Sequence, residues 1–91
     1  MTETIRRRAV ISGEVQGVNF RSATEDEASG AGLAGWVRNR DDGTVEAVLE
    51  GDSDAVERVL EWCRSGPSSA SVEDVDVSEE EPEGLTEFEQ G

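Results

Sequence analysis

The chain has 91 residues, enough for one small domain spanning residues 1–91 and not for two. Its 22 acidic residues outnumber 8 basic residues, all of them arginine, so the net charge is −14, and histidine is absent. This charge argues against nucleic acid and anionic membranes as partners, because both require a net basic face. The lack of histidine excludes His-based triads and His metal sites, and we expect neither a metal nor another cofactor.

The acidic surface predicts a protein that depends on salt. Its charges repel one another in dilute buffer, whereas at about 1 M salt the Debye length falls to about 3 Å and the repulsion is screened. We therefore expect a salt-rich cytoplasm such as that of an extreme halophile; an ordinary acidic protein is the alternative. A single cysteine, no apolar run near the roughly 18 residues of a membrane helix and no signal-peptide pattern also favour a cytoplasmic location.

Residue patterns predict an alternation of strands and helices along the chain. The first strand begins with Arg6-Arg7-Arg8, a run too short for nucleic-acid binding, which we interpret as a solvated strand start. Taken in order, strands are expected over residues 5–13, 36–40, 44–50 and 71–77, helices over residues 22–31 and 55–64, and a short last strand over residues 85–89.

Local signals support the ends and faces of these elements. Ser22 and Glu25 have the spacing of a capping box for the first helix. The Asp41-Asp42-Gly43 turn between two strand-like runs is a hairpin signal. In the second helix an apolar stripe at helical spacing ends at Cys63, which we expect to be a buried small residue.

The predicted order of elements is strand, helix, strand, strand, helix, strand. This is the order of the α+β ferredoxin-like βαββαβ sandwich, a four-stranded antiparallel sheet with two helices on one face. The short last strand would add a fifth. Because this fold serves many functions, the order of elements does not by itself identify one.

The stretch Gly13–Arg21 joins the first strand to the first helix and predicts an anion site. Glycines let the backbone approach a ligand closely, and the helix N-terminus adds partial positive charge. Arg21 can add a planar, bidentate donor for phosphate. From spacing alone, a plain strand-to-helix turn whose arginine forms a structural salt bridge is equally consistent with these residues.

Two motifs resemble a known family. Gly13-Glu14-Val15-Gln16-Gly17-Val18-Asn19-Phe20-Arg21 resembles the first signature of the acylphosphatases, and the stretch from Gly35 to Glu46 resembles the second. The resemblance implies a free-standing, monomeric enzyme that hydrolyses the carboxyl-phosphate bond of acyl phosphates without metal. The alternative is a non-catalytic module that binds phosphate or carbamoyl phosphate.

The resemblance also implies roles for individual residues. Arg21 corresponds to the arginine that holds the phosphate, and Asn39 to the asparagine that orients the attacking water. The backbone N–H groups of Val15, Gln16, Gly17, Val18, Asn19 and Phe20 correspond to the phosphate-cradling loop. From the sequence alone, Asn39 also suits a strand-end residue bonded to the adjacent turn. Strand alternation places Arg38 and Arg40 on the face opposite Asn39 as surface charges, and Gln16 is expected to brace the loop.

Overall fold

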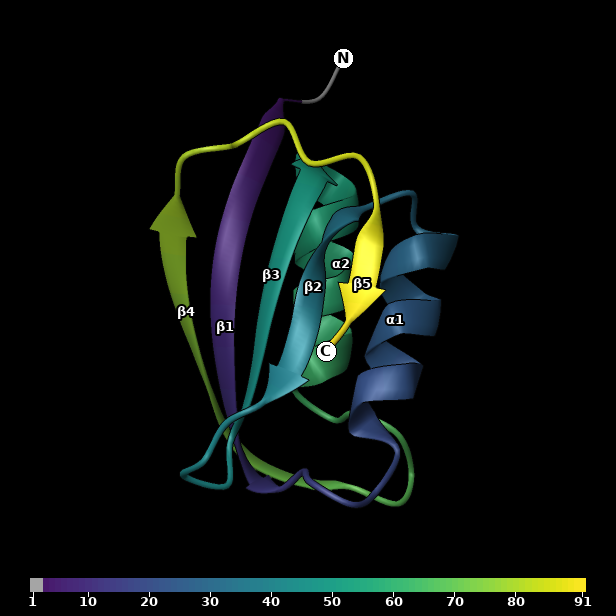
Figure 1. Ribbon diagram of the computed structural model, residues 1–91, viewed down its shortest axis with the longest axis vertical. Helices are drawn as coiled ribbons and strands as arrows, with labels where there is room; N and C mark the ends of the chain where they lie inside the picture. Colours follow the sequence, from purple (N-terminus) through teal and green to yellow (C-terminus); the bar gives the residue numbers. More distant parts are fainter. Residues whose placement is uncertain (1–2) are drawn as a thin grey trace.

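The computed structural model describes residues 3–91, which form a five-stranded mixed sheet with two helices on one face (Figure 1). The strand order is β4-β1-β3-β2-β5, and the neighbours among the first four strands are antiparallel. In chain order the elements are β1 (Thr4–Glu14), α1 (Phe20–Gly30), β2 (Ala34–Asn39), β3 (Val45–Asp52), α2 (Ser53–Cys63), β4 (Ser71–Glu80) and β5 (Phe88–Gln90). The predicted ferredoxin-like sandwich is confirmed.

The helix-facing side of the sheet carries the apolar core. Successive side chains in a strand alternate between faces, so the odd-numbered residues of β1 and β3 point toward the helices. The helices contribute one apolar face each, and Cys63 lies in the core as predicted, where burial raises the pKa of its thiol to about 12. The largest fully buried side chains include Ile11, Val15, Phe20, Val45, Leu49 and Val56.

The opposite side of the sheet, which no helix covers, carries a chain of ion pairs that we call the open-face network. Arg6 bonds to Glu50 at 3.2 Å and to Glu80 at 2.9 Å, and the side chain of Arg6 is only 5% exposed. The arginine run is therefore not a solvated strand start, because the neighbouring carboxylates allow Arg6 to be buried. The members of the network are Arg6, Arg8, Arg38, Glu46, Glu50 and Glu80.

The start of α1 differs from the sequence prediction. Ser22 is not the N-cap; the helix begins at Phe20, and Asn19 caps it in the left-handed conformation without a side-chain hydrogen bond. The reason is that Asn19 tolerates φ 67°, so the chain can turn into the helix three residues before the predicted cap. The hydroxyl of Ser22 instead donates to Oε1 of Gln90 at 3.2 Å.

The last strand forms over Phe88–Gln90 and not over residues 85–89. It also makes the sheet mixed, because it runs parallel to its neighbour. β5 pairs parallel with β2, with Phe88 opposite Gly35 and Gln90 opposite Val37. Phe88 is half-buried against the core. Figure 1 shows the segment after β4 crossing the end of the sheet to reach this edge, where β5 covers the side of β2 that would otherwise be unpaired. Between residues 3 and 91, no helix is long and apolar enough to cross a membrane.

Candidate functional site

The loop between β1 and α1 exposes a row of backbone donors. Gly17 has φ 75° and Asn19 has φ 67°, so two left-handed residues bend the chain within three positions. Between residues 3 and 91, the backbone N–H groups of residues 16–22 find no hydrogen-bond acceptor. Donors brought together in this way at a helix N-terminus form an anion-binding concavity.

The loop is fixed from both sides without using these donors. The side chain of Gln16 donates to the carbonyl oxygens of Arg40 at 2.7 Å and Thr44 at 2.9 Å, which attaches the loop to the β2–β3 hairpin. On the other side, Ser69 Oγ donates to the carbonyl oxygen of Val18 at 2.6 Å. The predicted bracing role of Gln16 is confirmed. Because these bonds use a side-chain amide, a hydroxyl and carbonyl oxygens, the loop is held in shape while its N–H groups stay available.

Two apolar side chains anchor the loop to the core. Val15 and Phe20 are each 1% exposed and stand at its two ends. The ring of Phe20 lies 5.6 Å from that of Trp62, and it also contacts Gly66, where an added Cβ would come within 2.5 Å of the ring. The start of α1 is thereby fixed in position, and with it the backbone direction at Arg21.

A cavity of about 100 Å³ lies where the loop, the start of α1 and the end of β2 meet. It brings together Arg21 and Asn39, although 18 positions separate them in sequence. Gln16 and Val18 do not line it; they act through the bonds described above. The lining residues are Val15, Gly17, Asn19, Phe20, Arg21, Ser22, Asn39 and Gln90.

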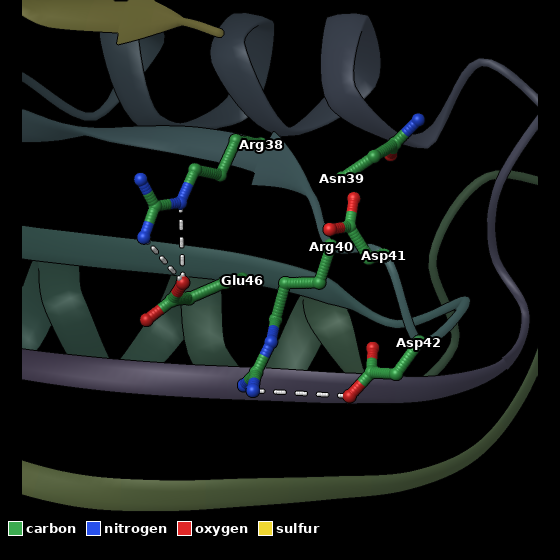
Figure 2. A pocket seen from close by; sticks show the side chains of 6 residues that line it. All are labelled: Arg38, Asn39, Arg40, Asp41, Asp42 and Glu46. Atoms are coloured by element: carbon green, nitrogen blue, oxygen red, sulfur yellow. Dashed lines mark hydrogen bonds and ion pairs between the residues drawn. The ribbon is translucent and has the colours of Figure 1, made fainter.

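Asn39 stands at the edge between two hollows, and the larger one is the less suitable for an anion. That larger hollow, about 620 Å³, lies around the hairpin and contains Arg38 and Arg40. Figure 2 shows each arginine directed toward a carboxylate, Arg38 to Glu46 and Arg40 to Asp42, with the side chain of Asn39 pointing away from them. Strand alternation had predicted this separation. We therefore place the site in the smaller cavity.

The β2–β3 turn is closed without the side chain of Asn39. The Arg40 N–H donates to the carbonyl oxygen of Thr44 at 2.9 Å, and Asp42 accepts both the N–H and the hydroxyl of Thr44. These bonds from Thr44 lower the pKa of the Asp42 carboxyl below its ordinary value. Between residues 3 and 91, no hydrogen bond joins the side chain of Asn39 to the turn, and Asn39 lines the cavity.

The C-terminal segment supplies two contacts that the sequence analysis missed. The side chain of Gln90 lines the cavity and accepts from Ser22, and the backbone oxygen of Gly91 accepts from the guanidinium of Arg21. These residues lie about seventy positions from the loop in sequence, and no motif or periodicity marks them. Only the parallel pairing of β5 with β2 brings them to the site.

The charge inside the cavity favours an anion. Arg21 is its only charged lining residue within the described chain. Glu14, the last residue of β1, is exposed and does not line the cavity. A guanidinium, a row of N–H groups and a carboxamide can together bind phosphoryl oxygens and orient a water molecule.

Comparisons with known proteins agree with this geometry. A sequence model of the acylphosphatase family matches residues 7–90. An acylphosphatase of Gloeobacter violaceus is 53% identical over 89 residues, covering 98% of this chain and 96% of the relative. Solved acylphosphatases of Coxiella burnetii and Bacillus subtilis superpose with TM-scores of 0.93 and 0.92. The Coxiella protein is 34% identical, and the match covers 97% of this chain and 93% of that protein. The Bacillus protein is 39% identical, and the match covers 96% of this chain and 98% of that protein. The chain belongs to the acylphosphatase family, the enzymes that hydrolyse the carboxyl-phosphate bond of acyl phosphates.

Proposed function

We propose that the loop N–H groups and Arg21 hold the phosphoryl group of the acyl phosphate, and that Asn39 orients the attacking water. One observation carries this assignment: the donors of residues 16–22, without acceptors between residues 3 and 91, belong to a loop and helix start that border a cavity also lined by Arg21 and Asn39. The loop N–H groups and Arg21 supply hydrogen bonds and positive charge to the phosphoryl oxygens. Asn39 can accept a hydrogen bond from water and donate one to an oxygen at the same time.

The chemistry asks little more of the site. Water attacks phosphorus, the bond between phosphorus and the acyl oxygen breaks, and the products are a carboxylate and inorganic phosphate. A carboxylate is weakly basic, so it leaves without a general acid. The site must position the reactants and stabilise charge on the phosphoryl oxygens. In this proposal the absence of histidine is no obstacle, and no metal or cofactor takes part.

Hydrolysis of benzoyl phosphate in about 3 M KCl with a chelator present tests these roles. Arg21→Ala should lower kcat/KM by at least about 100-fold, the effect expected for losing one donor to the transition state. Arg64→Ala is the matched control, because Arg64 is exposed and forms an ion pair with the exposed Glu61, three residues earlier. If the two variants retained equal activity, Arg21 would not hold the phosphoryl group. Activity that the chelator abolished would refute the metal-free mechanism.

A non-catalytic module, which binds phosphate or carbamoyl phosphate but hydrolyses no substrate, would give a different result. It should bind inorganic phosphate through Arg21 but release no phosphate from benzoyl phosphate above the uncatalysed rate. Turnover by the wild-type chain therefore separates the two functions.

The setting of the enzyme completes the proposal. Residues 1–91 act as one monomeric domain in the cytoplasm, with an acyl phosphate as substrate and no nucleic-acid partner. The net charge of −14 supports a requirement for high salt, since screening removes the repulsion among acidic side chains. Unfolding followed by denaturant from about 0.05 to 3 M KCl should show stability that rises with salt. Equal stability at both limits would contradict this requirement.

A further inference from the structure

Glu50 is a buried carboxylate that lies outside the cavity and holds the C-terminal segment. It is 3% exposed at the end of β3, where Arg6 donates to it at 3.2 Å. Three consecutive backbone N–H groups also donate to it, from Glu83 at 3.0 Å, Gly84 at 2.8 Å and Leu85 at 2.9 Å. Figure 1 shows that this crossing lies at the end of the sheet opposite the loop between β1 and α1.

The segment held by Glu50 runs directly to the cavity. After Leu85 the chain is fixed to β2 by a hydrogen bond from Gly35 to the carbonyl oxygen of Glu87, 2.9 Å, and then by β5. A last backbone bond runs from Gly91 N–H to the carbonyl oxygen of Val37, 2.7 Å. The contacts of Gln90 with Ser22 and of Gly91 with Arg21 follow at once. Residues 83–91, which we call the strap, thus connect Glu50 to the guanidinium of Arg21.

Beyond Glu50, the first half of the strap is held by a 3.6 Å ion pair between Arg6 and the exposed side chain of Glu83. The side chains of residues 81–87 are exposed, including Leu85, and β5 pairs over only three residues. A short edge strand with one half-buried side chain binds weakly when its preceding segment is free. The three hydrogen bonds from the strap to Glu50 are therefore the main attachment of the strap on the side away from the cavity.

We propose that Glu50 is a positioning residue for the phosphate site, which it serves by keeping the strap docked against β2 and Arg21. This inference rests on the proposed role of Arg21. If the strap detaches, Arg21 loses its contact with Gly91 and the cavity loses the wall formed by Gln90. Only the docked fraction of molecules is then ready to bind phosphate, so the apparent affinity falls by that fraction. Once phosphate is bound, the site is assembled and catalysis proceeds as before.

The expected signature is a rise in KM with little change in kcat. Glu50→Gln keeps the shape of the side chain but replaces one acceptor oxygen by an NH₂ group, which opposes the N–H donors. We expect the Kd for inorganic phosphate and the KM for benzoyl phosphate to rise about tenfold, corresponding to a docked fraction of about one tenth. The kcat should stay within about threefold of the wild type.

The chain offers a matched control in Glu46. Glu46 lies on the same strand, four residues before Glu50, and therefore on the same face of the sheet. It is 6% exposed and pairs with Arg8 and Arg38. Its hydrogen bonds and ion pairs go to Arg8 and Arg38, and none joins it to residues 83–91. Glu46→Gln should therefore weaken the open-face network but leave the Kd for inorganic phosphate and the KM unchanged.

The experiment compares both variants in about 3 M KCl by calorimetric titration with inorganic phosphate, by benzoyl phosphate kinetics and by hydrogen exchange at the Gly35 and Gly91 amides. Faster exchange and weaker phosphate binding in Glu50→Gln alone would support the proposal. Equal effects in both variants would overturn the proposal, since general loosening of the sheet would then be the cause. Wild-type phosphate binding and wild-type hydrogen exchange in Glu50→Gln would also overturn it.

A second variant covers the case in which Glu50→Gln fails to fold. Leu85→Pro removes one of the three strap donors, leaves Glu50 and Arg6 in place and alters an exposed side chain. It should raise the Kd for phosphate in the same direction, and wild-type affinity would overturn the proposal. The proposed function fails separately, if Arg21→Ala binds phosphate as the wild type does.

Discussion

The two faces of this small sheet treat arginine in opposite ways. On the open face, the arginines of the network each contact at least one carboxylate, and Arg6 contacts three, those of Glu50, Glu80 and Glu83. At the start of α1, Arg21 has no carboxylate side chain within ion-pair distance between residues 3 and 91, and its guanidinium donates to the backbone oxygen of Gly91. Both environments occur in a chain with a large excess of acidic residues.

The difference separates charges that stabilise the fold from charges that bind a ligand. A buried arginine paired on several sides can be removed only by leaving carboxylates unpaired, so its loss should appear in stability. An arginine and a row of N–H groups without anionic partners retain their capacity for a substrate, so their loss should appear in activity. The predictions below test this division, beginning with the largest effect.

Removing Arg6 should give the largest loss of stability. Arg6→Met fills a similar volume but leaves the buried Glu50 without a guanidinium and Glu80 with Arg8 alone, and breaking a buried pair from one side costs about 3–5 kcal/mol. Arg64→Met should cost less than about 1 kcal/mol, because its pair with Glu61 is exposed. Denaturant unfolding in about 3 M KCl measures both. Equal losses would mean that the open-face network contributes no more than a surface pair.

Replacing Asn39 should affect turnover and leave stability nearly unchanged. Asn39→Ala removes the carboxamide that orients water, and we expect kcat for benzoyl phosphate to fall by about 100-fold. The Kd for inorganic phosphate should stay within about twofold, because Arg21 and the loop donors remain. Weaker phosphate binding with normal turnover would show that Asn39 holds the phosphate and does not orient water.

The sequence predicts the fold because the fold is encoded locally. Strand alternation, the Asp41-Asp42-Gly43 turn and the apolar stripe of α2 each depend on residues a few positions apart. The residues joined in the cavity, Arg21 and Asn39, belong to two motifs whose resemblance to the acylphosphatases supplied the long-range information. Physical patterns alone left each of them with an equal or better structural explanation.

What the sequence did not reveal depends on distant residues. The burial of Arg6 requires Glu50 and Glu80, which are 44 and 74 positions away. The place of Gln90 in the cavity requires β5 to pair parallel with β2, a choice that three residues do not encode. The early start of α1 depends on a left-handed Asn19, whereas the capping box at Ser22 was a competing local signal that the structure does not use.

Within the loop, Gly17 should link stability and activity. Its φ of 75° disfavours a side chain although no atom lies within 4 Å of an added Cβ, so Gly17→Ala should cost about 1–2 kcal/mol through backbone strain alone. Relaxation of that strain would turn the N–H groups away from the cavity and raise KM. Gly30→Ala is the control, because Gly30 ends α1 without a positive φ and has equally open surroundings. It should be neutral or stabilising. A loss shared by both variants would argue against strain at Gly17.

The smallest expected effect is the dependence of stability on acidic pH, which concerns the carboxylates of the open face. Burial raises the pKa of Glu50, but the N–H groups of residues 83–85 and Arg6 outweigh this effect, so the pKa lies below its ordinary value of 4.5. The pKa of Glu80 is also lowered, by its bonds to Arg6 and Arg8.

A carboxyl whose pKa is lower in the folded state stabilises the fold above its unfolded pKa and loses this contribution as pH falls. The difference in free energy of unfolding between the wild type and Glu50→Gln should therefore be constant from about pH 7 to 5 and shrink below about pH 4.5. Measurements in about 3 M KCl screen the repulsion among exposed carboxylates, which would otherwise relax on protonation and mask the change. For Glu61→Gln, an exposed carboxylate of α2, the difference should be small at every pH. A difference for Glu50→Gln that grew on acidification would mean that its carboxylate is destabilised in the fold, and that the strap is held by some other group.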